Sequence, residues 1–355
     1  MRIDHEELRN LATAICEKMG AESADARTVA DHLVDANLMG HDSHGVGMLP
    51  VYAFNHASGA LQPRAHAKLV SERGAVLVVD GQAGFGQVVA PEAMEMGLQR
   101  VQEHGIVAVG LRNAHHIGRV GTYGELCASR GYVSMHYVNV VGHPPMVAPY
   151  WGAEARLNTN PYCCAVPVPD DEPIVLDMAT SAVAHGKVRV ANLAGERVAE
   201  GLLLDNQGRP TTDPGVMFPQ RGEASGALTA FGLHKGSGLS LICEVLGGAL
   251  AGAWTMEKQF DGITVVNGML TILIDPARFG GSDLFASTVG SVKAYIKGTR
   301  PAEGKQQVLV PGEPERIARK ERSADGIPMS EGGWATIVEV ADKLGVSTSD
   351  HISTI

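Results

Sequence analysis

The chain has 355 residues, of which 45% are hydrophobic and 19% charged, a composition typical of a globular protein with one large or two moderate domains. Its formal net charge is -10 and no run of Lys or Arg is present, so neither a nucleic acid nor a membrane surface is expected as a partner. The five cysteines show no CxxC spacing, and the N-terminal segment lacks the apolar core of a secretory signal. These features predict a reduced, cytoplasmic protein.

Helical spacing dominates the start of the chain. Asp4 followed by Glu7 forms a capping-box pattern ahead of apolar positions that recur until Gly20. Ser23 is expected to cap a second helix, which ends at Gly40. The chain therefore begins with a predicted pair of helices.

The middle of the chain alternates short apolar runs with turn residues, which predicts strands. A helix expected over 91–104 separates the first two runs, as in an α/β unit, and a buried helix is expected within 236–256. The predicted strands are 75–80, 106–111, 133–141, 163–168, 174–177, 202–205 and 270–274.

The tail, from Thr299 onward, is rich in Pro, Gly and charge and is expected to end in a helix around 333–344 that packs back on the N-terminal helices. We therefore predict two domains. One is helical and is formed by residues 1–74 with 305–355, and the other is an α/β domain of residues 75–304.

Two histidine-containing segments are candidates for chemistry. HDSHG at 41–45 follows a predicted helix end, where side chains can converge on a pocket, although a simple polar loop fits equally well. NAHHIGRVG at 113–121 follows the strand 106–111, where open α/β sheets place ligand-binding residues. Histidine is the usual acid or base near neutral pH, but spacing alone leaves open whether His115, His116 or neither is catalytic. No HExxH pattern is present, and we expect no metal site.

The glycine-rich segments at 81–86, 118–124 and 235–238 match neither GxGxxG nor the P-loop pattern. DMATSA at 177–182 places an acid at a strand end before small hydroxyl residues that can open a helix and offer backbone N–H groups to a phosphate. An N-capped buried helix without a ligand is the alternative for this segment.

Eight segments, in a fixed order along the chain, resemble the malate/L-lactate dehydrogenase-like family, and the similarity extends from about Ile3 to Val346. Within that family the hydroxycarboxylate dehydrogenase branch is nearest. The eight are HDSHG at 41, NAHHIG at 113, MVAPYWG at 146, NTNP at 158, LDMATS at 176, GRPTTDP at 208, HKGSGLSLICEVLGGALAG at 234 and VLVPGE at 308.

The resemblance implies a homodimeric oxidoreductase that interconverts small 2-hydroxy and 2-oxo carboxylic acids with NAD or NADP. It implies an α/β fold whose cofactor domain is of a non-Rossmann type, with a mostly antiparallel mixed sheet, beside a smaller helical domain. His116, not His115, corresponds to the acid/base of the family, with Ser43 and His44 beside the substrate and the nicotinamide. The alternatives are a reductase of cyclic imino acids and a non-catalytic ligand-binding relative.

The resemblance also implies roles in binding. Substrate contacts are implied for Met48, Tyr52 and Arg119. Many family members carry Arg at the position of Met48, where it binds the substrate carboxylate in bidentate fashion. Because Met48 cannot do this, Arg119 is the nearest cationic candidate for binding the carboxylate here. The implied cofactor contacts are His44, Gly118, Arg119, Val120, Asp177, Met178, Ala179, Thr180, Ser181, Lys235, Asn267, Pro311, Gly312 and Glu313.

Overall fold

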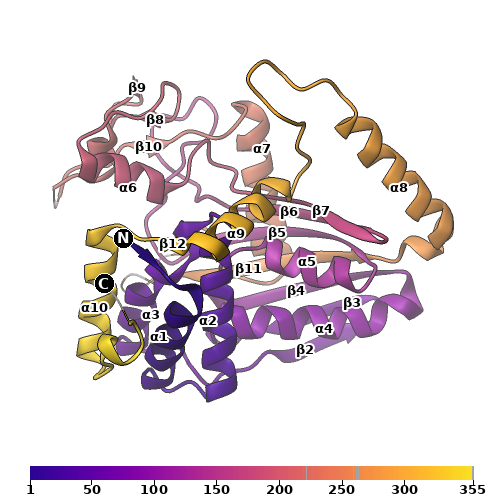
Figure 1. Ribbon diagram of the computed structural model, residues 1–355, viewed down its shortest axis with the longest axis horizontal. Coiled ribbons are helices and arrows are strands. Elements are labelled where there is room, and N and C mark those ends of the chain that lie inside the picture. Colours follow the sequence, from indigo (N-terminus) through magenta and orange to yellow (C-terminus); the bar gives the residue numbers. More distant parts are fainter. Residues whose placement is uncertain (221, 259, 261, 263, 354–355) are drawn as a thin grey trace.

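The computed structural model describes residues 1–353 except 221, 259, 261 and 263, and its centre is a seven-stranded sheet (Figure 1). Only β3 and β4 are parallel, and every other neighbouring pair is antiparallel. The predicted α/β fold with a mixed sheet is therefore confirmed. In spatial order the strands are β2 (Lys68–Arg73), β3 (Val76–Asp80), β4 (Ile106–His115), β11 (Val266–Ile274), β5 (Val133–Val141), β6 (Tyr162–Val168) and β7 (Asp171–Met178).

The helices α4 (Gly86–His104) and α5 (Gly121–Ser129) pack on this sheet and share one hydrophobic cluster with it. Another helix, α7 (His234–Cys243), continues into the π-helical segment η4 (Glu244–Leu250), which packs on β5 and β11. A Cβ at Gly247 would lie 2.6 Å from the Tyr137 carbonyl oxygen, so only glycine allows this close approach. Within the described residues, no helix has the length and apolar character needed to cross a membrane.

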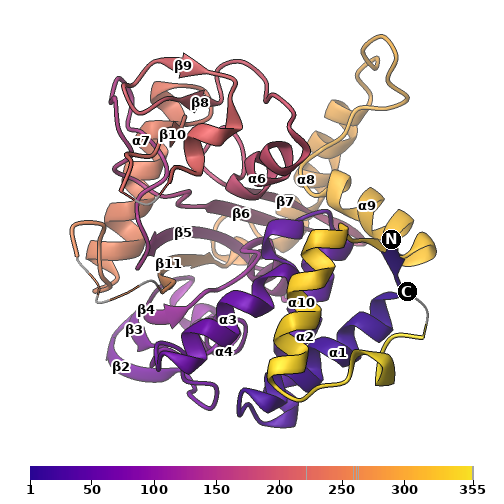
Figure 2. The same cartoon turned by 90° about the vertical axis from the view of Figure 1, so that its left-hand side faces the viewer.

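A second hydrophobic cluster joins the two ends of the chain. It contains α1 (His5–Lys18), α2 (Ser23–Leu38) and α3 (Leu49–Ala57) together with α10 (Glu331–Lys343). Figure 2 shows α10 running beside the N-terminal helices, and β1 (Arg2–Ile3) pairs with β12 (Ile327–Pro328). The tail does return to the N-terminal helices, while the exact limits of the two domains stay a prediction.

Of the two helix caps predicted at the start of the chain, one is present and one is not. Asp4 accepts hydrogen bonds from the backbone N–H groups of Glu6 and Glu7, so the predicted cap of α1 is confirmed. Ser23 was the wrong choice of cap for α2, because the N-cap position belongs to Glu22 and the Ser23 hydroxyl bonds the carboxylate of Glu17.

The helix expected to open within 177–182 is absent, and this prediction is wrong. Strand β7 runs on to Met178, and the next helix, α6 (His185–Ala194), begins only at His185. The physical reason is that both the backbone N–H and the hydroxyl of Thr180 donate to the carbonyl oxygen of Thr159, at 2.9 Å each. These bonds tie the segment to a neighbouring loop and leave no helical hydrogen bonds for it to make.

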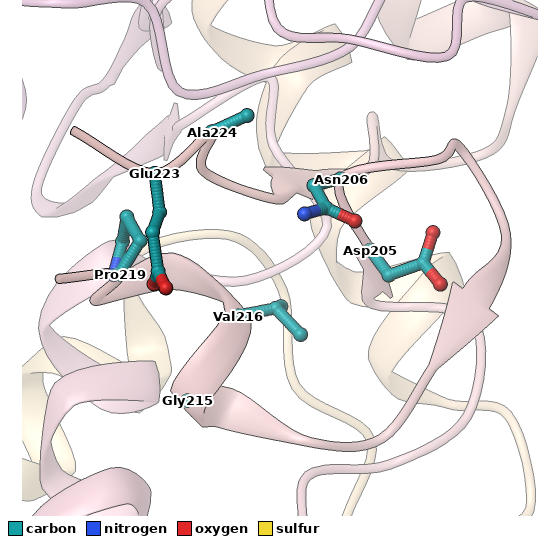
Figure 3. Close-up of a pocket in the computed structure, with 7 residues that line it drawn as sticks. All are labelled: Asp205, Asn206, Gly215, Val216, Pro219, Glu223 and Ala224. Carbon is teal, nitrogen blue, oxygen red and sulfur yellow. The ribbon is translucent and has the colours of Figure 1, made fainter.

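The residues between β7 and α7 form a small lobe, and its hydrophobic cluster also includes Val147 and Leu157 from the segment between β5 and β6. Its sheet contains β8 (Leu203–Leu204), β9 (Pro210–Thr211) and β10 (Ala227–Leu228), so the strand predicted over 202–205 is present but short. This lobe contains a cavity of about 160 Å³. Figure 3 shows the residues that line it, namely Asp205, Asn206, Gly215, Val216, Pro219, Glu223 and Ala224. None of these residues belongs to a predicted site.

Two further helices complete the fold. Helix α8 (Ser282–Lys297) stands apart at the edge of the molecule in Figure 1, and α9 (Glu313–Asp325) follows it after a long connection. Lys293 holds α8 to the start of β7 through Asp171, at 2.7 Å.

Candidate active site

Three predicted site residues meet at the end of β4. His116 follows the last residue of that strand, and the Tyr52 hydroxyl on α3 lies 2.7 Å from its Nδ1. The ring of His44, from the short helix η1 (Asp42–His44), stacks on the ring of His116, with centroids 5.6 Å apart and planes 6° apart. No described residue forms a hydrogen bond with Nε2 of His116. That nitrogen is therefore available to a substrate.

The neighbouring His115 also lies beside Tyr52, with ring centroids 5.2 Å apart, but its hydrogen-bond partner is different. It is 1% exposed, and its Nε2 accepts a hydrogen bond of 2.8 Å from the side-chain amide of Asn55. Burial lowers the pKa of His115 to about 3. The ring is thus held neutral inside the protein and has no access to a substrate.

His116 itself is half-buried. Burial lowers its pKa well below the ordinary value, and the imidazoles of His44, His115, His32 and His143 add to this effect. A neutral ring at pH 7 has one nitrogen free to accept a proton, and that nitrogen is Nε2 when Nδ1 carries the proton of the ring.

Ser43 and Met48 are the other predicted site residues in this part of the chain. The Ser43 hydroxyl is 3.1 Å from Nδ1 of His44. The start of α6 lies against Ser43, since a Cβ at Gly186 would be 3.4 Å from the Ser43 Cβ. Met48 is half-buried and packs against the cluster formed by the two chain ends.

Arg119 is almost fully buried, with 2% of its surface exposed. Its two terminal nitrogens donate to the carboxylate of Glu125 at 2.9 and 2.8 Å, and its Nε lies 3.8 Å from Asp177 Oδ2. Its backbone N–H donates to Nε2 of His32 at 2.9 Å. The guanidinium is therefore already paired with one carboxylate, and its burial leaves little of it accessible to a substrate.

The segments expected to bind the cofactor converge around the end of β7. Asp177 Oδ2 accepts the N–H of Gly121, the first residue of α5, at 2.7 Å. The Val175 N–H donates to the carbonyl oxygen of Pro311 at 3.1 Å, which brings the 311–313 loop to the same strand. On the other side, the Thr180 carbonyl oxygen accepts the N–H of Phe231, ahead of the exposed Lys235 at the start of α7.

The loop after His116 is anchored from β11. Asn267 is 2% exposed, and its Oδ1 accepts the N–H of Ile117 at 3.0 Å while its Nδ2 donates to the Asn139 carbonyl oxygen at 2.9 Å. Gly118 has φ +69°, and a Cβ there would lie 2.3 Å from Nε2 of His32. Val120 is buried at the N-cap of α5. These contacts fix the backbone beside the ring of His116.

The 311–313 loop adjoins a cavity that suits an anionic cofactor. The cavity has a volume of about 260 Å³ and is lined by Gln307, Leu309, Glu313, Arg316, Ile317 and Lys320. One terminal nitrogen of Arg316 is buried without a hydrogen-bond partner within the described chain. A buried, unsatisfied guanidinium nitrogen beside a second cation fits a phosphate group. The Glu313 carboxylate, by contrast, is occupied by Lys297 and by the N–H of Val310.

Sequence reasoning missed three residues of this region, namely His32, Asn55 and Gln87. Each is buried and bonds to a residue of the site or to its neighbours. In the sequence, His32 is a polar residue within a predicted helix, Gln87 follows a glycine-rich segment, and Asn55 lies where no element was predicted. Such features are too common to indicate a site.

Comparison with known proteins decides the family. The family model for malate/L-lactate dehydrogenase matches residues 3–338. The chain belongs to this family. It is 45% identical to hydroxycarboxylate dehydrogenase B of Escherichia coli O157:H7, over 97% of this chain and 95% of the relative.

Two further members show the range of the family. A Δ1-pyrroline-2-carboxylate/Δ1-piperideine-2-carboxylate reductase of Pseudomonas putida is 32% identical, over 92% of this chain and 96% of the relative. The solved structure of sulfolactate dehydrogenase from Methanocaldococcus jannaschii superimposes with a TM-score of 0.87, at 33% identity and 99% coverage of both chains. The chain is thus an enzyme of an oxidoreductase family.

Proposed function

We propose that this enzyme is an NAD(P)-dependent dehydrogenase that interconverts small 2-hydroxy and 2-oxo carboxylic acids. The observation that carries the proposal is the position of the His116 ring in a chain of the malate/L-lactate dehydrogenase family. Tyr52 bonds Nδ1 of this ring, and no described residue bonds Nε2. A half-buried imidazole in this arrangement suits a general acid and base.

The residues of the chain handle the proton. In oxidation, His116 takes the proton of the substrate hydroxyl at Nε2, and in reduction it returns a proton to the carbonyl oxygen. The nicotinamide group, when bound, accepts or supplies the hydride. Tyr52 holds the ring of His116, and Ser43 and His44 form the wall beside it.

The cofactor is proposed to lie along the end of β7 in a non-Rossmann manner. The segments joined there are 177–181, 311–313, the start of α7 with Lys235, and the 118–120 loop held by Asn267. Backbone N–H groups and cations in these segments suit the phosphates of NAD or NADP. Arg316 and Lys320, which line the cavity beside the 311–313 loop, add two cations to these segments.

The same proton donor would serve a C=N bond, so a cyclic imino acid is the second candidate substrate. The P. putida relative is named for such a reaction. A neutral His116 must first be protonated in either reduction, so the geometry of the ring does not separate the two substrates.

A homodimer is proposed on the basis of exposed apolar side chains. Helix α8 exposes Leu284, Val292 and Tyr295, with 62%, 54% and 81% of their surface accessible. Apolar surface of this kind is usually covered by a partner chain. Light scattering coupled to size-exclusion chromatography should give a mass equal to that of two chains. In a Tyr295→Asp, Val292→Asp double variant, the measured mass should fall toward that of a single chain.

The reaction is tested with a panel of 2-hydroxy acids, 2-oxo acids and cyclic imino acids, each assayed with NAD(H) and NADP(H) through the absorbance of the reduced nicotinamide. We expect turnover with hydroxy and oxo acids. Turnover confined to imino acids would select the second candidate. No turnover with any of them, despite cofactor binding in calorimetry, would contradict a catalytic role.

A further inference from the structure

Gln87 lies behind the catalytic ring with no role that the proposed reaction assigns to it. It is the second residue of α4, is 0% exposed, and its Nε2 donates to the Tyr52 hydroxyl at 2.6 Å. The same hydroxyl is 2.7 Å from Nδ1 of His116. Gln87, Tyr52 and His116 therefore form a continuous chain of hydrogen bonds that ends at the reacting group.

The backbone brings Gln87 to this place by a close approach. A Cβ at the preceding Gly86 would lie 2.4 Å from the carbonyl oxygen of His116 and 2.6 Å from that of His115. Only glycine allows the first turn of α4 to press against the backbone of the catalytic segment. The position of Gln87 is thus fixed relative to His116 and does not depend on a mobile loop.

The direction of the hydrogen bonds has a chemical consequence. Among the described residues, the Tyr52 hydroxyl bonds only the amide N–H of Gln87 and Nδ1 of His116, so its proton has Nδ1 as an acceptor and Nδ1 then carries a lone pair. In this arrangement the neutral ring holds its own proton on Nε2. A base that acts at Nε2 needs the opposite arrangement, in which Nδ1–H donates to Tyr52 and Tyr52 donates onward to an acceptor.

The side-chain amide of Gln87 can supply that acceptor. Its Oε1 is buried and has no hydrogen-bond partner among the residues that the structure describes. Turning the amide over would place Oε1 where Nε2 now meets Tyr52. Glutamine is thus able to face Tyr52 with a donor or an acceptor, whereas a carboxylate offers only an acceptor and methionine offers only a weak one.

We propose that Gln87 is a positioning residue that, through Tyr52, sets which ring nitrogen of His116 carries the proton. The inference rests on the proposed function, in which His116 is the acid and base. Gln87 touches neither the substrate nor the cofactor and acts only through the hydroxyl of Tyr52.

The charges around His116 make the effect measurable. The titratable groups that face the ring come from α2, η1, α3, β4 and the loop after β5, and they are His32, His44, Tyr52, His115 and His143. None of these groups is a carboxylate. A carboxylate at position 87 would therefore add a negative charge that now has no counterpart in this cluster, and it would favour the protonated ring.

The experiment compares Gln87→Glu and Gln87→Met with the wild type by ¹⁵N NMR of histidine-labelled protein without substrate, over a range of pH. We expect His116 to hold its proton on Nε2 in the wild type and on Nδ1 in Gln87→Glu, with the pKa of His116 raised by about one unit or more. Gln87→Met should give a mixture of the two tautomers.

The matched control is Asn55→Asp, which makes the same change from amide to carboxylate beside His115. We expect this variant to change the NMR signals of His115 and to leave the tautomer of His116 as it is. In the oxidation assay, the acidic limb of kcat/KM should move to higher pH in Gln87→Glu alone, and Gln87→Met should lose roughly tenfold in kcat with little change in KM for the cofactor.

The results distinguish a failure of the role proposed for Gln87 from a failure of the proposed function. If His116 keeps its wild-type tautomer and pKa in both Gln87 variants while their melting temperatures fall, Gln87 is only structural and the inference is wrong. If the tautomer changes as expected but a His116→Asn variant retains full turnover, the proposed function is wrong and the hydrogen-bond chain still exists.

Discussion

At the scale of single residues, two adjacent histidines differ in their hydrogen-bond partners although both rings lie beside Tyr52. Nε2 of His115 accepts a hydrogen bond from Asn55, whereas His116 bonds Tyr52 through Nδ1 and its Nε2 has no partner among the described residues. A pair of identical side chains thus provides a structural residue and a candidate catalyst within one dipeptide.

The first prediction uses this contrast. His116→Asn removes the proton acceptor, so turnover should fall by about 10² to 10⁴ while the melting temperature and cofactor affinity are retained. His115→Asn should cost stability instead, because the buried amide of Asn55 loses its acceptor. Steady-state kinetics and thermal melting of both variants test this. Equal losses of turnover in the two would mean that His116 has no special part in the chemistry.

The second prediction concerns Arg119. Its guanidinium lies between Glu125 and Asp177, so Arg119→Ala leaves two carboxylates without their cation. We expect a higher KM for the cofactor and a lower melting temperature, with the ranking of oxo-acid substrates unchanged. A changed ranking, together with a loss of roughly 30-fold or more in kcat/KM, would instead identify Arg119 as the partner of the substrate carboxylate.

At the scale of elements, strand β7 organises the candidate cofactor site although its sequence marks it only as a strand. Its end meets the start of α5 through Asp177, and its edge meets the 311–313 loop through Val175. The carboxylate of Asp177 lies at a helix N-terminus, where the backbone N–H groups and the helix dipole stabilise a negative charge.

The third prediction compares the two ends of this strand. Asp177→Asn weakens the contact with α5 and with Arg119, and we expect cofactor affinity to fall by about tenfold, or roughly 1.4 kcal/mol. Asp171→Asn, which loses its ion pair with Lys293, is the control and should leave cofactor affinity unchanged. Calorimetric titration measures both. Unchanged binding in Asp177→Asn would place the cofactor elsewhere.

The sequence predicted the parts of the fold that depend on local pattern. The strands 106–111 and 133–141 follow from runs of apolar residues, and the cap at Asp4 follows from side-chain chemistry. Helix α3, which carries Tyr52, was not expected, and neither was the role of Gln87, because both depend on contacts between segments far apart in the chain. The candidate catalytic residues came from the family resemblance, since spacing alone did not separate His115 from His116.

At the scale of the whole molecule, the interior holds several imidazoles. His32, His115 and His136 are each buried with a pKa lowered to about 3, chiefly by burial. In the unfolded chain they would titrate near pH 6.5. The folded state therefore binds fewer protons than the unfolded state between these two values.

The fourth prediction follows from that difference. As pH falls below about 6.5, protonation stabilises the unfolded chain, so the free energy of unfolding should decline by up to about 1.4 kcal/mol per pH unit for each such residue, until about pH 3. Urea unfolding at a series of pH values measures the slope. His136→Asn should reduce it, because one imidazole of the three is removed. A slope that does not change would show that His136 is not a source of acid sensitivity.

The place of β11 also bears on how the molecule folds. Strands β4 and β5 do not pair with each other, and β11 lies between them, bonded to both. Asn267 on β11 joins residues 128 and 150 positions away in the chain. Until β11 inserts, the sheet consists of two separate halves, and the loop that carries His116 lacks its bond to Asn267. Insertion of β11 is expected to be slow, because a large loop of the chain must close first. In a refolding experiment, enzyme activity should therefore appear together with this slow step, and not in proportion to the helix content.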